Sequence, residues 1–508
     1  MATDYTSKKL SLHVAEQFNE SFSEPEPSSV GYVFIGNHIP YTNEASPDTI
    51  FESISSEKQV WDNIFAAKRI TGSDTSLVIP IKIWSTDQLF YQFDDQIPIL
   101  TSDVNFYTIN SNNQVYKCLS NNNGTLSTYE PTGDYSINNG LIETSDGYIW
   151  KYMYGYDSSN KFKTDSYIPV PRTANSQGYY TSINSIVDGA IYSIAITNSG
   201  YNYNVATINA YAYGTGTNSI KLESLINVAN NMLVYGLGVP SNTTVSSINV
   251  ANVSITISKN TSSNGGGTSN TLIFYPNALI IGDGVGATAN LIISSTNTIS
   301  KIIMTNYGSG YSYANVVIYA NTNSGSARAI MGPKYGHGYY PAKELSANSV
   351  MISVKFGDVD TTEGGLISAN TTIRQYGFLR DPAKYGNTVS VNSLTANSFI
   401  SQTYKVTVVT GSSYNLNEKV YQGNISSPSF VGYVNSQTSN IINLSKVRGS
   451  LTLGSALVGE TSLISRSAID IQYPDLQPYS GDILYANNIQ YIQRTFGQTE
   501  NFNFVLRF

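Results

Sequence analysis

A run of large rings that alternate with other residues constrains the fold of this chain more than any other feature. Asp146-Gly147 predicts a turn, because both residues accept turn geometry, and a ring then follows at every second position. Successive side chains of a β-strand point to opposite faces, so a period of two places all four rings on one face. The rings belong to Tyr148, Trp150, Tyr152 and Tyr154. Such a face has to be buried, and we expect this strand at the centre of a sheet core.

The composition also favours β structure. Charged residues make up only 12% of the chain, about half the usual share, and the chain holds 40 glycines and 39 tyrosines. Many β-branched and aromatic residues with few charges are typical of strands, and of surfaces that become buried in an assembly. At 508 residues the chain is too long to fold around a single hydrophobic core of ordinary size. We therefore expect several domains, or one core with large insertions.

Charge and cysteine usage exclude several classes of protein. The chain has 28 basic and 35 acidic side chains, a net charge of −7 and no basic run, which argues against nucleic-acid binding. Cys118 is the only cysteine, so no internal disulfide can form, and we expect folding in a reducing compartment. We find no apolar leader and no long apolar run, and therefore expect neither a signal peptide nor a membrane span.

Two helices are predicted near the start of the chain. Apolar residues recur at every fourth position between 10 and 22, which predicts a helix with one apolar stripe. A second helix is expected to begin at Ser56, with Gln59 completing a capping box, and to carry its apolar stripe as far as Phe65. Residues 31–36 between the helices predict a short buried strand.

The remaining sequence suggests a core interrupted by two insertions. Residues 173–334 carry almost no charge and contain an imperfect duplication, in which 194–203 is echoed by 302–313 as strand, glycine turn and strand. Short strand signals predict a small barrel or sandwich at 399–467. We therefore expect a mainly β fold: a layered β-sandwich core with a few peripheral helices and two all-β insertion domains. The core segments would be 1–172, 335–398 and 468–508.

Aromatic residues supply the expected core and the expected contacts. The structural core is predicted to include Tyr148, Trp150, Tyr152, Tyr154, Trp84, Trp61 and Phe504. Tyrosine offers a large contact area with one polar tip, which makes the tyrosines of the duplicated motif candidates for contact with a partner. These are Tyr201, Tyr203, Tyr311 and Tyr313.

No set of residues predicts a metal, a cofactor or a catalytic site. The three histidines, His13, His38 and His337, lie far apart in sequence and have no second ligand at metal spacing. Cys118 lies on a predicted strand, where a buried, inert thiol is expected.

Two pairs of acidic residues are the only candidates for the two carboxylates of a glycosidase. One pair is Asp94 with Asp95 and the other is Asp358 with Asp360. Adjacent or alternate residues are poorly placed to flank one bond and are commoner in loops, so we expect loops at both pairs.

Motifs spread along the chain resemble the baseplate wedge protein of T-even-like contractile-tailed phages, the gene product eight family. The resemblance rests on the order of segments 32–36, 40–44, 78–84, 115–119, 146–152, 167–171, 482–485 and 500–504. It covers about the first third of the chain, the strands after Val350 and the last forty or so residues. The family prototype is much shorter, and the two insertions resemble those of cyanophage-type relatives, so no role is carried over to them.

The resemblance implies a non-enzymatic structural protein of the virion. It implies a sandwich core, a homodimer within each wedge, and contacts with neighbouring wedge proteins in the tail baseplate, which triggers sheath contraction on host attachment. Assembly would take place in the host cytoplasm. Rigid sandwiches suit this role, because they can relay a rigid-body rearrangement between neighbours.

An adhesin of the tail-fibre or tailspike type is the alternative. The bias toward Asn, Thr, Ser, Gly and Tyr suits binding of host surface polysaccharide, with Asp358 or Asp360 as hydrolytic carboxylates. Two copies of a motif fall short of the long regular repeat of a β-helix, which disfavours this reading. A third reading keeps the structural core and assigns glycan binding to the insertions alone.

Overall fold

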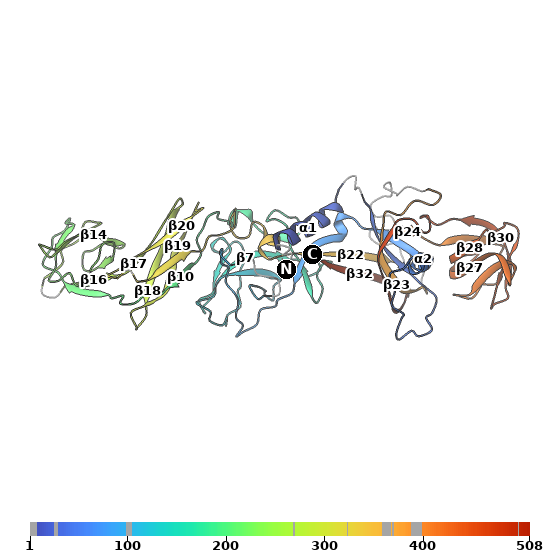
Figure 1. Cartoon of the computed structure of the whole chain (residues 1–508), viewed down its shortest axis with the longest axis horizontal. Helices are drawn as coiled ribbons and strands as arrows, with labels where there is room; N and C mark the ends of the chain where they lie inside the picture. The colour runs from blue at the N-terminus through green and yellow to red at the C-terminus, as the bar shows by residue number, and fades with distance from the viewer. Residues whose placement is uncertain are drawn as a thin grey trace, which may run out of the picture. The chain divides into compact units, whose positions relative to one another are not determined.

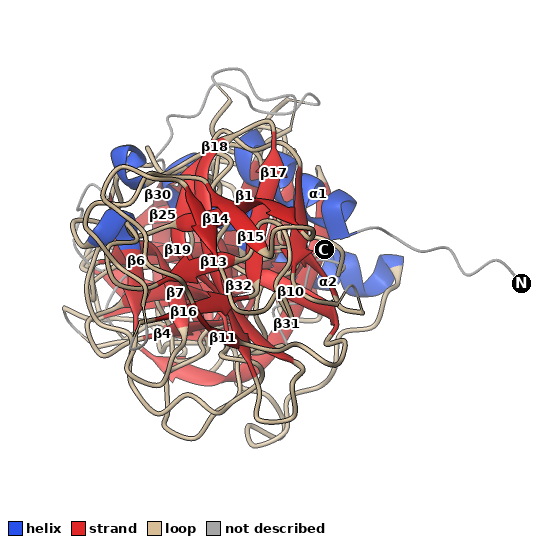
Figure 2. Ribbon diagram, turned by 90° about the vertical axis from the view of Figure 1, so that its left-hand side faces the viewer, coloured by secondary structure: helices blue, strands red, loops and turns tan. Residues whose placement is uncertain are grey.

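The computed structural model describes residues 8–24, 29–97, 104–267, 270–322, 324–357, 367, 370–387, 399–495 and 497–508. The fold is mainly β, with 45% strand and 8% helix, as expected (Figure 2). The chain divides into two compact units, Met1–Val78 with Asn348–Phe508, and Ile79–Ala347. The expected segment 1–172 is thus shared between the two units.

Two sheets form a sandwich in the first unit. One sheet contains, in order, β24 (Phe399–Ser401), β2 (Ile64–Arg69), β1 (Gly31–Gly36), β23 (Thr372–Arg380) and β31 (Asp482–Gln493). The other contains β32 (Thr499–Arg507), β22 (Ser349–Gly357) and β3 (Thr75–Pro80). Buried side chains of both sheets share one core, with Val33 and Phe65 from the first and Val354 and Phe356 from the second. This interdigitation is the basis of sandwich packing.

The helices are few and short. They are α1 (Lys8–Ser21), α2 (Ile54–Asn63) and α3 (Pro341–Glu344), with 3-10 turns η1 (Gly72–Asp74), η2 (Asn138–Gly140) and η3 (Ile183–Ser185). The predicted stripe on α1 is only partly correct. Leu10 and Val14 are exposed, whereas Phe18 and Phe22 pack against the sandwich core. Leu12 and Ala15 are buried, so the first half of the helix packs through a different face than the predicted ladder. Within the described residues, no helix is both long and apolar enough to cross a membrane.

Helix α2 begins and ends earlier than its sequence predicts. Its N-cap is Ser53, whose hydroxyl accepts a hydrogen bond from the amide of Ser56 at 3.1 Å. The helix ends at Asn63, and Ile64 and Phe65, which were expected on the helical stripe, belong to strand β2. Pairing with β1 supplies backbone hydrogen bonds to this buried segment, and that pairing overrides the local period.

A closed six-stranded barrel follows in the same unit (Figure 1). Its strands, in order around the barrel, are β25 (Tyr404–Val408), β28 (Ile441–Gly449), β27 (Ser427–Thr438), β26 (Lys419–Asn424), β29 (Ala456–Gly459) and β30 (Ser465–Gln472). Fully buried residues such as Val406, Phe430 and Leu444 fill its interior. The barrel extends beyond the predicted range of 399–467, while β24 pairs with the sandwich.

An aromatic sheet opens the second unit. It contains β4 (Tyr107–Ile109), β5 (Gln114–Ser120), β7 (Ile149–Tyr156) and β6 (Leu141–Glu143), with β9 (Tyr179–Tyr180) paired to β7. β8 (Tyr167–Pro169) follows β7 in sequence. Almost every residue of β7 is buried, so the predicted strand lies at the centre of a core on both of its faces.

The four predicted rings, of Tyr148 directly before β7 and of Trp150, Tyr152 and Tyr154 within it, nevertheless do not share one face. Val115 of β5 lies opposite Tyr154, whereas the next residue of β5, Tyr116, lies opposite Tyr152. Met153 is therefore an extra residue in β7, a bulge that turns Tyr154 to the other face. One face buries Phe90, Tyr116, Cys118, Tyr148, Trp150 and Tyr152. The expected row of four rings is thus a row of three, and Tyr154 contacts Tyr156 and Tyr179 instead.

Two six-stranded sheets make up most of residues 194–329. The first contains β10 (Ile194–Asn198), β21 (Ser326–Ala329), β20 (Ala314–Tyr319), β17 (Asn277–Gly282), β18 (Val285–Ile293) and β19 (Ile299–Ser309). The second contains β11 (Ala206–Asn209), β16 (Thr271–Tyr275), β13 (Leu233–Tyr235), β14 (Thr243–Asn249), β15 (Ser254–Ile257) and β12 (Ser219–Lys221). Each sheet has its own core. The two copies of the duplicated motif begin in the same sheet, but the first copy continues into the second sheet.

Candidate functional site

An apolar groove lies at one edge of the sandwich, where β31 ends the first sheet and β32 ends the second. Its volume is about 770 Å³. Its lining combines helix α1 with strands of both sheets and includes Phe18, Phe22, Tyr376, Phe378, Leu484, Tyr485, Phe504 and Leu506. A groove of this size with mostly apolar walls is typical of surfaces that bind another molecule.

Tilted and edge-on rings form the floor of the groove. The centroids of Phe378 and Phe504 lie 4.2 Å apart, and Tyr376 lies 5.4 Å from Phe504 and 5.5 Å from Phe502. These pairs connect β23 in one sheet to β32 in the other. The two sheets are therefore held together at this edge by aromatic contacts.

Strand β31 leaves part of its outer edge uncovered. Among the described strands it pairs only with β23. Leu484 is 59% exposed and Tyr485 is also exposed, whereas the side chains of Asn488, through Nδ2, and Gln490, through Nε2, donate to the backbone carbonyls of Asp48 and Ala45. Among the described residues, the first half of β31 thus combines an edge that no further strand covers with exposed apolar side chains, which favours pairing with another protein segment.

The predicted core residues lie where they were expected, with two partial exceptions. Tyr148, Trp150, Tyr152, Tyr154 and Trp61 are all buried. Trp84 and Phe504 are half-buried, and each packs against a cluster of buried core residues.

The tyrosines of the duplicated motif divide into two kinds. Tyr201 and Tyr313 are exposed, so their rings are free to meet a partner. Tyr203 and Tyr311 lie in the core of their own sheet, and their hydroxyls accept hydrogen bonds from the amides of Gly325 at 2.9 Å and Ala287 at 3.3 Å. These two residues therefore hold the sheet together and offer no ring to a partner, in contrast to the prediction.

His38 joins the sandwich to the barrel. Its Nδ1 lies 2.7 Å from Oδ1 of Asn417, and its Nε2 lies 2.6 Å from Oγ of Ser445. Burial lowers the pKa of His38 to about 4, so the ring is neutral at pH 7. A neutral ring can donate through Nδ1 and accept through Nε2, which satisfies both neighbours.

A buried cluster of charged residues lies on the face of β5 and β7 opposite the three rings. Nζ of Lys117 lies 3.0 Å from Oε2 of Glu344, and Nδ1 of His337 lies 2.8 Å from the same oxygen. Nζ of Lys151 donates to the carbonyls of Asn139 at 2.6 Å and Ser185 at 3.1 Å. Sequence reasoning missed this cluster, because Glu344 lies more than 190 residues after both lysines.

The pKa shifts within this buried cluster of charged residues favour a structural role for it. Burial alone would raise the pKa of Glu344, but Lys117 and the hydrogen bond from His337 outweigh it and lower the pKa. Burial and the nearby Lys117 lower the pKa of His337, and burial lowers the pKa of Lys151 to about 8. The carboxylate of Glu344 thus balances buried positive charge. Within the described ranges, no three His, Cys, Asp or Glu side chains are arranged to hold a metal.

The other predicted candidates were two pairs of acidic residues and the single cysteine. Asp94 and Asp95 both bind the guanidinium of Arg328, at 2.5 Å and 2.7 Å, so this pair is neutralised by an ion pair. Asp358 and Asp360 lie outside the described residues. Cys118 is fully buried, and burial raises the pKa of its thiol.

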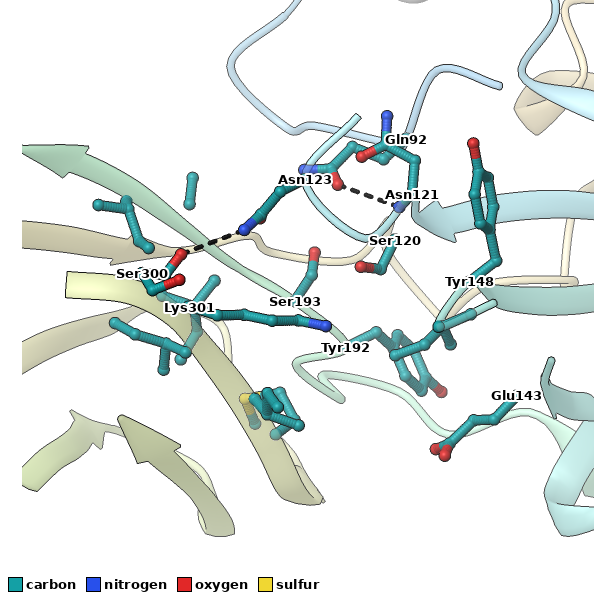
Figure 3. A pocket seen from close by; sticks show the side chains of 18 of the residues that line it. Gln92, Ser120, Asn121, Asn123, Glu143, Tyr148, Tyr192, Ser193, Ser300 and Lys301 are labelled. Atoms are coloured by element: carbon teal, nitrogen blue, oxygen red, sulfur yellow. Dashed lines mark hydrogen bonds between the residues drawn. The ribbon is translucent and has the colours of Figure 1, made fainter. Parts of the chain in front are cut away.

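A polar cleft of about 640 Å³ lies in the second unit (Figure 3). One side comes from residues of the aromatic sheet and the loops around it, and the other from strands β10 and β19. Its walls carry side-chain amides, hydroxyls, tyrosines and one lysine. No sequence motif marks this cleft, since more than 40 residues of sequence separate its two sides.

No protein-family model matches the chain, and no curated protein matches its sequence.

Proposed function

We propose that the chain is a structural subunit of the baseplate wedge of a contractile phage tail. In this role it holds and relays interfaces between neighbouring wedge proteins during host attachment and sheath contraction. The protein would act as a homodimer in the virion and would catalyse no reaction. The motif resemblance suggests this assembly, and the open edge of the sandwich supports it as a surface for a neighbouring subunit.

The observation that carries the proposal is the open edge of the sandwich. On the side away from β23, the first half of β31 has no neighbouring strand among the described residues, and the groove beside it is lined largely by exposed and half-buried rings. An uncovered apolar edge is a liability in a free monomer, because it promotes unintended pairing. Coverage by a subunit of the same assembly removes that liability.

The architecture behind the edge also suits a mechanical role. The barrel interior is filled, and the two sheets of the sandwich share a continuous core. Closely packed interiors deform little, so a displacement at one contact is passed on as a rigid-body movement.

Substitution at the edge tests the proposal. The tagged chain is produced together with the tail proteins encoded beside it, captured through its tag and examined for stable complexes. Leu484→Asp places a charge on the uncovered edge and should abolish at least one complex. Leu463→Asp is the matched control, because Leu463 is 78% exposed in the loop between β29 and β30 and does not line the groove. Complexes that survive Leu484→Asp unchanged, or a wild-type chain that forms none, count against the proposal.

A further inference from the structure

The polar cleft of the second unit has walls of contrasting chemistry. Its apolar side comes from β10 and β19, with Ile194, Ile196, Ile302 and Met304 among the lining residues. The opposite side is formed by Gln92, Ser120, Asn121 and Asn123, which precede the aromatic strand in sequence. A volume of about 640 Å³ is within the usual range for pockets that bind small molecules.

Amides and hydroxyls converge on this cleft (Figure 3). Nδ2 of Asn123 donates to the carbonyl of Ser300 at 3.1 Å, which fixes one amide at the rim. The hydroxyls of Ser120 and Ser193 and the Nε2 of Gln92 make no hydrogen bond to protein within the described part of the chain, and all three side chains are half-buried. These groups can donate to and accept from a ligand that is itself rich in hydroxyls.

Tyrosine rings supply the apolar surface that such a ligand also needs. Tyr192 and Tyr307 lie with centroids 5.2 Å apart, and Tyr307 is half-buried within the cleft. The hydroxyl of Tyr307 donates to Oε1 of Glu143 at 2.5 Å, which holds its ring in place. A sugar ring has one hydrocarbon face that packs on an aromatic ring and an equatorial belt of hydroxyls that needs hydrogen bonds.

The charges in the cleft are few and balanced. Among the described residues that line it, Lys301 is the one cation, and its Nζ donates to Oδ1 of Asn122 at 2.7 Å. Glu143 is the one carboxylate in the same described lining. Phosphates and nucleotides are normally held by several cations or by a glycine-rich helix N-terminus, and neither lines this cleft. A neutral ligand with many hydroxyls fits the walls better than an anion.

We propose that this cleft binds a short stretch of neutral oligosaccharide. One sugar ring packs against Tyr307, and its hydroxyls bind the free donors of Gln92, Ser120 and Ser193. Lys301 and Glu143 add one charged donor and one charged acceptor at the rim. This binding activity is independent of the proposed assembly role, because it uses a different unit of the chain.

Titration calorimetry of the full chain tests the inference with defined probes. The neutral probes are maltohexaose, cellohexaose, mannohexaose and chitohexaose, and an oligogalacturonate of equal length is the acidic comparison. At least one neutral probe should bind, and the oligogalacturonate should bind more weakly. Failure of every neutral probe, or binding of the acidic probe alone, would overturn the proposal.

Two tryptophan variants locate the binding. Ser300 is exposed on the rim, so Ser300→Trp fills the cleft without disturbing the core and should weaken binding at least about tenfold. Ser219→Trp is the matched control, because Ser219 is exposed on β12 and does not line the cleft. Equal affinity in wild type and Ser300→Trp would place the sugar elsewhere and contradict the assignment. Lys301→Met should also weaken binding, with the thermal unfolding temperature showing that the variant is folded.

Discussion

Phe378 on β23 and Phe504 on β32 lie with ring centroids 4.2 Å apart and join the two sheets of the sandwich at its open edge. Tyr376 and Phe502 extend this contact on the same strands. The aromatic residues that stabilise the sandwich are therefore the same ones that form the floor of the exposed groove. A substitution of these rings should therefore affect both the stability of the sandwich core and the shape of the exposed groove.

Removal of the Phe378 ring should destabilise the first unit. Phe378→Ala leaves a cavity between the sheets and should lower the free energy of unfolding by about 3 kcal/mol. Urea unfolding followed by tryptophan fluorescence, to which Trp61 of the first unit contributes, measures the change. Phe51→Ala is the control, because Phe51 is 73% exposed and its loss should change stability by less than about 0.5 kcal/mol. Similar effects of both substitutions would show that the rings at the edge do not join the sheets.

Burial of His38 should make the first unit less stable in acid. The pKa of His38 is lowered from 6.5 to about 4, so between these values the unfolded chain binds a proton that the folded chain excludes. Unfolding free energy should therefore fall as pH falls through this window, by up to about 1.4 kcal/mol per pH unit. Urea unfolding at several pH values measures the slope. His38→Gln should reduce this slope, and an unchanged slope would assign the acid sensitivity to other groups.

Glu344 should be essential for the stability of the second unit. Glu344→Gln removes the charge that balances Lys117 and should cost about 3 to 5 kcal/mol, because it leaves a buried cation without a partner. The double variant Lys117→Met with Glu344→Gln should recover part of this loss. Thermal unfolding of the single and double variants measures the coupling. Strictly additive losses would contradict a direct interaction between the two side chains.

Cys118 should be inert in the folded protein. Its thiol is fully buried and burial raises its pKa, so little reactive thiolate forms at neutral pH. A disulfide reagent such as dithionitrobenzoate should label the native chain negligibly over hours and label the urea-unfolded chain within minutes. Rapid labelling of native protein would indicate that the aromatic sheet opens locally.

The local hydrophobic pattern correctly predicted elements in which pairing with other strands leaves that pattern unchanged. The buried strand at residues 31–36 is confirmed as β1, and the β character of the chain follows from its alternating segments. Ile64 and Phe65 were assigned to a helix because their spacing fits one, yet pairing with β1 makes them a strand. The bulge at Met153 likewise turns Tyr154 to the other face, and a bulge leaves no trace in a strict alternation of rings.

The candidate sites depend on contacts that no local pattern records. The groove combines α1 with strands near residue 376 and near residue 504, and the cleft combines loops near residue 121 with a strand near residue 302. Tyr203 and Tyr311 resemble Tyr201 and Tyr313 in sequence, but their hydroxyls are held by backbone amides inside the sheet. Burial distinguishes the first two tyrosines from the last two, and the burial of a residue depends on the whole fold.

An electron cryomicroscopy map of the assembled tail would show whether the chain is a baseplate subunit and what covers its open edge. We predict that the chain lies in the baseplate and that a neighbouring protein covers the groove and the first half of β31, including Leu484 and Tyr485. A chain absent from the baseplate, or one present there with this edge open to solvent, would contradict it.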